Sequence, residues 1–102
     1  MITYEITATV ELDLVVRYED YMRSRHIPDL LGTGCFLAAT FSRSAAGRYR
    51  IRYEAADREA LARYLSEHAA ELRAHVAEVF PEGVHLSREE WEVLESWPVS
   101  ER

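Results

Sequence analysis

The sequence predicts a small α+β domain in which two helices cover one face of an antiparallel four-stranded sheet. Two segments, 2–12 and 48–55, alternate strictly between apolar and polar residues, as half-buried strands do. The segments that follow Asp13 and Asp57 carry apolar residues at helical spacing. The resulting order, β-α-β-β-α-β, is that of a ferredoxin-like fold. A length of 102 residues fits one domain, which we place at residues 1–95, followed by a loose tail over 96–102.

The strands are defined by their alternation. The first runs from Ile2 to Leu12 with its apolar face on the even-numbered residues, and the second, Cys35–Arg43, is apolar on both faces at its start. After a short connection at 44–47, the third strand has inward residues Tyr49, Ile51, Tyr53 and Ala55 and outward residues Arg48, Arg50, Arg52 and Glu54. In the predicted sheet order 4-1-3-2, the outward arginines lie near Glu5 and Glu11 of the neighbouring first strand. This helix-free face is expected to meet water or a second copy of the chain.

Capping residues and prolines predict where the two helices begin and end. Asp13 caps the first helix, which we expect to end near His26 because Pro28 disfavours helical geometry at the residue before it. Pro28 then opens a separate short turn. Asp57 caps the second helix, predicted as one continuous helix that ends before Pro81.

The last segment allows two interpretations. Val84 and Leu86 fit a strand, but unbroken alternation would turn Arg88 and Glu90 inward, so a strand through Trp91 needs a β-bulge near Arg88. Alternatively, residues 87–90 form a capping box that begins a short third helix extending into residues 87–95. We favour the bulged strand.

The composition argues against several classes of partner. Eighteen acidic residues against twelve basic ones give a net charge of -6, which disfavours general binding to nucleic acid or to an anionic membrane. The arginine-rich strand also lacks the outward aromatic residues on which an RNA-binding sheet stacks bases. No apolar run is long enough to cross a membrane, and residues 1–5 lack a charged and apolar leader. We therefore expect a soluble, cytoplasmic protein that needs no cofactor.

The segment from His26 to Phe36, HIPDLLGTGCF, resembles the HIP-x-x-L-x-T-G-C-F segment of a family of short bacterial proteins described as a domain of unknown function. Further matches lie at Met1–Val10, Arg63–Ala69, Leu72–Arg73 and Arg88–Glu89. This chain departs from the family at Ala70, where the family has proline, and in its acidic end with Trp91 and Trp97. The resemblance implies a dimeric α+β barrel, the architecture of antibiotic-biosynthesis monooxygenases, muconolactone isomerases and small polyketide cyclases. It implies no reaction.

Histidines are the candidates for proton transfer, because their ordinary pKa lies near neutrality. Helical spacing turns His68 towards the sheet, as a general base, a ligand donor or a core residue paired with a tyrosine or a carbonyl. His26 either caps the first helix or forms an acid-base dyad with Asp29 or His68. Cys35 is either a small buried residue or a nucleophile activated by His26. Because His68 and His75 lie ~10 Å apart along one helix, we expect no metal site.

Two functions remain open. The preferred one is a homodimeric α+β barrel module, a binding or structural protein without established activity, whose tyrosines and histidine are packed without a sizeable cavity. The alternative is a cofactor-free isomerase, cyclase or monooxygenase in which His26 or His68 moves a proton of a small hydrophobic or aromatic molecule. Its pocket between helices and sheet would be lined by Tyr4, Tyr18, Tyr49, Tyr53 and Tyr64. The expected partners are a second copy and a small hydrophobic ligand.

Overall fold

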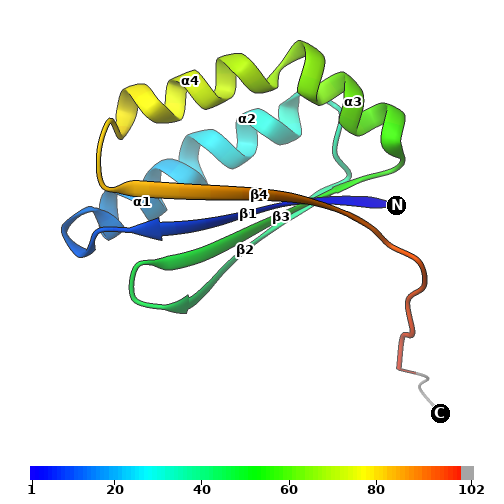
Figure 1. The fold of residues 1–102 in the computed structure, drawn as a ribbon, viewed down its shortest axis with the longest axis horizontal. Coiled ribbons are helices and arrows are strands. Elements are labelled where there is room, and N and C mark those ends of the chain that lie inside the picture. The colour runs from blue at the N-terminus through cyan, green and yellow to red at the C-terminus, as the bar shows by residue number, and fades with distance from the viewer. Residues whose placement is uncertain (100–102) are drawn as a thin grey trace.

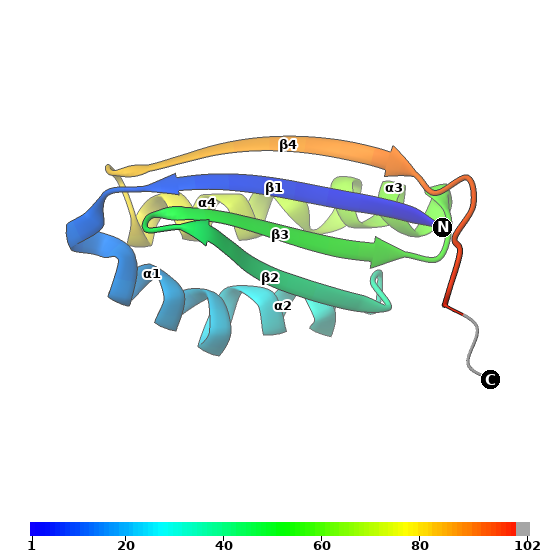
Figure 2. The ribbon, with the colours of Figure 1, turned by 90° about the horizontal axis from the view of Figure 1, so that it is seen from below.

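A helical layer lies on one face of a four-stranded sheet in the computed structural model, which describes residues 1–99 (Figures 1 and 2). The elements in chain order are β1 (Ile2–Val10), η1 (Leu12–Leu14), α1 (Val15–Tyr21), η2 (Met22–His26), α2 (Ile27–Gly32), β2 (Ala38–Ala45), β3 (Arg48–Ala55), α3 (Arg58–Glu67), α4 (Ala69–Val79) and β4 (Val84–Glu92). The strand order is β2-β3-β1-β4, and all neighbours are antiparallel. This confirms the predicted ferredoxin-like fold and sheet order.

The two faces of the central strands carry different side chains, as the alternation predicted. The buried residues of β3 are Tyr49, Ile51, Tyr53 and Ala55. The exposed ones on the opposite face are Arg48, Arg50 and Arg52. The register of β1 on β3 places Tyr4 opposite Tyr53 in the core and Glu5 opposite Arg52 on the helix-free face. Within residues 1–99 that outward pair is not close enough to form an ion pair.

The first helix does not end at His26, contrary to our expectation. The segments α1, η2 and α2 follow one another without a gap from Val15 to Gly32. Proline has no N–H, and its ring clashes with the carbonyl group four residues earlier, which here belongs to Ser24. Ser24 lies inside η2, a single π-helical turn. The wider π turn accommodates Pro28, so the helix continues and places His26 at the junction of η2 and α2.

The second helix is interrupted at His68, whose φ of -127° and ψ of -32° depart from helical values. Figure 1 shows the change of direction between α3 and α4. Leu61 and Tyr64 are the buried residues of α3, and Ala69 and Val76 are those of α4. The break changes the direction in which side chains point around the helix axis. The apolar stripe of α3 therefore ends before His68, whereas we predicted one continuous stripe through that residue.

The last segment is a strand, but the predicted bulge is wrong. β4 pairs with β1 in one unbroken register from Val84 opposite Val10 to Glu92 opposite Ile2. Arg88 therefore shares the inner face with Leu86. The fold tolerates this because β4 is an edge strand, and a long charged side chain at the margin of the helical layer still reaches water.

The connection before β2 is longer than predicted. Cys35 and Phe36 are buried before strand pairing begins at Ala38, rather than forming the start of the strand. Beyond β4, the N–H of Val93 donates to the carbonyl oxygen of Met1. The chain then runs away from the sheet (Figure 1). Residues 100–102 of the expected tail lie outside the described residues, and the boundary at residue 95 stays a prediction.

Candidate ligand site between the helices and the sheet

A small cavity lies between the helical layer and the sheet. Its volume is about 30 Å³, and its lining residues are Tyr4, Ile6, Tyr18, Met22, His26, Leu30, Ile51, Tyr53, Tyr64, Arg73, Val76, Leu86 and Arg88. A space of this size holds about one or two water molecules. The interior between the two layers is therefore largely filled by side chains, and an aromatic ligand has to displace some of them.

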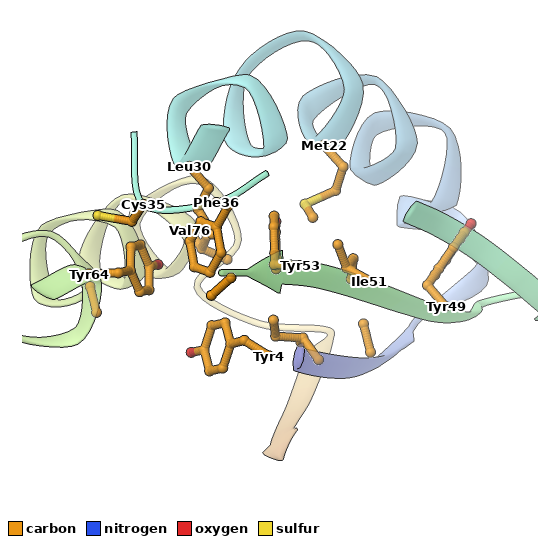
Figure 3. Close-up of a cluster of buried hydrophobic side chains, with 14 of the residues drawn as sticks. Tyr4, Met22, Leu30, Cys35, Phe36, Tyr49, Ile51, Tyr53, Tyr64 and Val76 are labelled. Carbon is orange, nitrogen blue, oxygen red and sulfur yellow. The ribbon is translucent and has the colours of Figure 1, made fainter. Parts of the chain in front are cut away.

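Aromatic rings fill the part of the core next to the cavity (Figure 3). Phe36 lies 4.9 Å from Tyr64 and 5.2 Å from Tyr53 between ring centroids, and Tyr4 lies 5.8 Å from Tyr64. Tilted contacts at these distances stabilise a core beyond the burial of apolar area. The cavity thus has one firm aromatic wall, formed by residues from β1, β3 and α3.

His26 lines this cavity and has a buried ring nitrogen. Its Nδ1 atom makes no hydrogen bond within the described part of the chain. The ring stacks on Tyr21 at 5.9 Å, while Asp29 is engaged by Arg25 at 3.1 Å instead of pairing with His26. Burial lowers the pKa of His26 to about 4, although the charge of Asp29 opposes this shift. At pH 7 the ring is neutral, so one ring nitrogen accepts a hydrogen bond and the other donates one.

The hydroxyl of Tyr53 is the second buried polar atom without a partner among residues 1–99. Burial raises the pKa of Tyr53, so its hydroxyl keeps its proton and can donate a hydrogen bond. Buried polar groups in proteins are almost always paired. Here both exceptions belong to residues that line the same cavity, one from the helical layer and one from the central strand β3.

Four of the five predicted ligand-binding tyrosines, Tyr4, Tyr18, Tyr53 and Tyr64, line the cavity. Burial raises the pKa of Tyr64 to about 12 and also raises that of Tyr18. The fifth, Tyr49, lies outside the cavity lining, towards the other end of β3 from Tyr53 and Tyr64 (Figure 3), and its ring packs on that of Tyr18 at 5.1 Å. Its hydroxyl donates to a carboxylate oxygen of Glu19 at 2.6 Å.

The structure does not bring the other predicted reactive residues to this cavity. The side chain of His68 is 36% exposed, and its Nε2 lies 4.0 Å from a carboxylate oxygen of Glu67. His75 places Nδ1 2.6 Å from the hydroxyl of Tyr21. The thiol of Cys35 is buried near the carbonyl oxygen of Thr33. In the described chain no three histidine, cysteine, aspartate or glutamate side chains gather as a metal site.

Three functional candidates escaped the sequence analysis: Met22, Arg73 and Arg88. Arg73 was named only as part of the family resemblance, because a single arginine in a helix gives no signal of a site. For Arg88 the signal was present, because unbroken alternation after Val84 turns it inward, and only the assumed bulge hid it. Both arginines line the cavity while remaining exposed to solvent, so they mark its mouth.

Solved structures similar to this chain share its fold at low sequence identity. HapK from Hahella chejuensis has a TM-score of 0.67 and 15% identity, with 99% of this chain and 100% of that chain covered. The heme-degrader MhuD from Mycobacterium tuberculosis, solved with two hemes in its active site, has a TM-score of 0.67 and 15% identity over 96% and 100% of the two chains. An antibiotic biosynthesis monooxygenase has a TM-score of 0.51 and 13% identity, with 96% of this chain and 100% of that chain covered. Such identities support the fold alone.

Among residues 1–99, every helix is too short or too polar to span a bilayer.

Two further comparisons concern the whole chain. No curated protein matches it. The model of one family, described as a domain of unknown function (DUF4286), matches residues 1–94. Because this match includes every strand and helix of the fold, the chain belongs to the DUF4286 family.

Proposed function

We propose that this protein is a homodimeric binding module that takes a small aromatic molecule between its helices and its sheet. One observation carries the proposal: His26 and Tyr53 line one cavity, and each has a buried polar atom, Nδ1 and the hydroxyl, that lacks a hydrogen-bond partner within residues 1–99. Leaving such a group unpaired costs about 1–3 kcal/mol. A ligand hydroxyl that pairs with these atoms recovers part of that cost.

The remaining lining fits an aromatic ring. Tyr4, Tyr18, Tyr64 and Ile51 supply apolar and aromatic surface around the two polar atoms, a combination typical of small-molecule sites. The cavity of about 30 Å³ must enlarge before a ring enters. Met22 is suited to this movement, because its unbranched side chain adopts several shapes and it begins the π-helical turn η2.

The electrostatics favour binding over proton transfer. A general base works best when its pKa lies near the working pH, and burial holds the pKa of His26 at about 4. The ring is consequently a good hydrogen-bond acceptor but a weak base at pH 7. We therefore place the cofactor-free enzyme second.

We place a second copy of the chain on the helix-free face of the sheet. Arg48, Arg50 and Arg52 on β3 are exposed there, and Glu89 and Trp91 lie on the same face of β4. Two copies in opposite orientation bring the basic strand of each against the acidic edge of the other. Trp91 is 52% exposed, and other large apolar residues exposed near this end are Met1, Leu37, Leu94 and Trp97. Such exposure is typical of a protein interface.

A cytoplasmic location is part of this proposal and agrees with the buried free thiol of Cys35.

Isothermal titration of the full chain with 4-hydroxybenzamide, a neutral aromatic hydroxyl compound, tests the ligand site. We expect saturable binding to the wild type and at least about tenfold weaker binding to His26→Phe and Tyr53→Phe, since each loses a hydrogen bond to the ligand. Tyr49→Phe is the matched control, because Tyr49 lies outside the cavity, and it should bind as the wild type does. Absence of binding to the wild type, or equal loss in all three variants, contradicts the proposal.

A further inference from the structure

The mouth of the cavity is formed by two arginines from different elements, Arg73 of α4 and Arg88 of β4. We infer that the ligand carries a carboxylate held between these two guanidinium groups, an inference that rests on the proposed function. The aromatic ring would then lie inwards, with its hydroxyl towards His26 and Tyr53. The ligand class is then a hydroxylated aromatic carboxylate.

The position of each arginine is set by the fold. The Nη2 atom of Arg73 donates to the hydroxyl of Tyr4 at 2.8 Å, which holds the guanidinium against the aromatic wall. Arg88 lies opposite Ile6 in the register of β4 on β1, so its side chain starts on the inner face of the sheet. One guanidinium thus approaches the mouth from the helical layer and the other from the sheet edge.

Neither guanidinium is neutralised by a carboxylate. In the described part of the chain, Arg73 and Arg88 make no ion pair within 4.0 Å, as is also true of the arginines on the open face of β3. The chain holds eighteen acidic residues against twelve basic ones, so acidic partners are plentiful overall. What distinguishes Arg73 and Arg88 is that both line one cavity, where their unpaired guanidinium groups leave a positive charge for a ligand to balance.

That charge reaches the interior of the cavity. Arg88 contributes to lowering the pKa of His26, and Arg73 and Arg88 both oppose the rise in the pKa of Tyr64 that burial causes. Guanidinium groups bind carboxylates through charge-assisted hydrogen bonds, which are about twice as strong as neutral ones. A carboxylate at the mouth gains these bonds without being fully desolvated, because both arginines remain partly in water.

The test compares, by titration into the full chain, two ligands that differ at one group: 4-hydroxybenzoate has a charged carboxylate where 4-hydroxybenzamide has a neutral amide. We expect the acid to bind the wild type about tenfold or more tightly than the amide. Arg73→Gln and Arg88→Gln should each weaken binding of the acid by about tenfold and weaken binding of the amide clearly less, because only the acid loses a charge-assisted bond. Arg63→Gln removes the same charge from α3, outside the cavity, and should weaken neither ligand.

The outcomes separate this inference from the proposed function. Equal affinity of the wild type for acid and amide, or equal weakening of both ligands by the Arg73 and Arg88 variants, overturns the carboxylate site while the aromatic site stands. Absence of binding by both ligands to the wild type overturns the aromatic site and this inference with it. The comparison of the two ligands on the wild type holds even where a variant fails to fold.

Discussion

His26 and Tyr53 line one cavity, and neither the Nδ1 atom of His26 nor the hydroxyl of Tyr53 has a hydrogen-bond partner among residues 1–99. The histidine is placed by the π-helical turn η2 before Pro28, and the tyrosine by the central strand β3. Two independent parts of the fold therefore converge on the same small space. Unpaired buried polar groups lower the stability of the free protein, and a ligand that pairs them raises it.

The buried neutral histidine predicts a pH dependence of stability. The ordinary pKa of His26 is 6.5, and burial lowers it to about 4 in the folded protein. Between these values the unfolded chain binds more protons, so acidification from pH 6.5 to 4 destabilises the fold through this group, by up to ~3 kcal/mol. Above pH 6.5 the contribution is complete. Urea unfolding of the wild type and His26→Phe across this range should show a smaller loss for the variant. Parallel pH profiles would mean that His26 titrates normally.

The hydroxyl of Tyr53 predicts an unusual result for a buried tyrosine. Tyr53→Phe removes a polar atom that has no partner, so the free energy of unfolding should stay unchanged or rise by up to ~1 kcal/mol. Tyr49→Phe is the comparison, because it removes a hydrogen bond of 2.6 Å to Glu19 and should lower stability. Chemical denaturation of both variants measures this. A larger loss for Tyr53→Phe than for Tyr49→Phe would show that the Tyr53 hydroxyl is paired.

The sequence predicted the fold well where its pattern is strictly periodic. The alternation in β1 and β3 assigned Tyr53 to the core and Arg52 to the open face, because a period of two leaves one register. Local rules failed where tertiary context overrides them. The rule that a helix ends before proline did not hold at Pro28, because a π turn absorbs the clash. The helix break at His68 could not be predicted, because no glycine or proline lies at this point in the sequence.

The candidate site was predictable only in part. His26 and four of the five tyrosines named from the sequence surround one cavity in the structure. Arg73 was missed because a single arginine in a helix usually points to solvent. Arg88 was misplaced because a charged residue on an inner strand face contradicts the usual pattern, and only its edge position in the sheet permits it. The size of the cavity depends on packing, which no sequence pattern specifies.

Shortening the side chain of Met22 is expected to lower the stability of the protein and to admit a larger ligand. Met22→Ala removes buried side-chain volume beside the cavity and should cost about 2–5 kcal/mol of stability. The same change enlarges the site, so a two-ring probe such as 6-hydroxy-2-naphthamide should bind the variant more tightly than the wild type. Met22→Leu conserves volume and serves as the control. Titration of both variants checks this, and unchanged affinity for the larger probe would show that Met22 does not limit the site.

The proposed dimer predicts a mass in solution of twice the 11.8 kDa of one chain. Arg50→Glu reverses a charge at the centre of the helix-free face and should shift the equilibrium towards monomer, by like-charge repulsion against the acidic edge of the second copy. Arg63→Glu makes the same change on α3 and should leave the dimer intact. Light scattering at micromolar concentration measures all three proteins. A monomeric wild type would exclude this assembly.

The side-chain nitrogens of His26 report most directly on the ligand site. In ¹⁵N-labelled wild-type protein at pH 7, we expect NMR signals of a neutral imidazole. Addition of 4-hydroxybenzamide should move the Nδ1 signal saturably, because that atom gains a hydrogen bond. A charged imidazole at pH 7, or an Nδ1 signal that stays in place while ligand is in large excess, would contradict a site built on His26 and Tyr53.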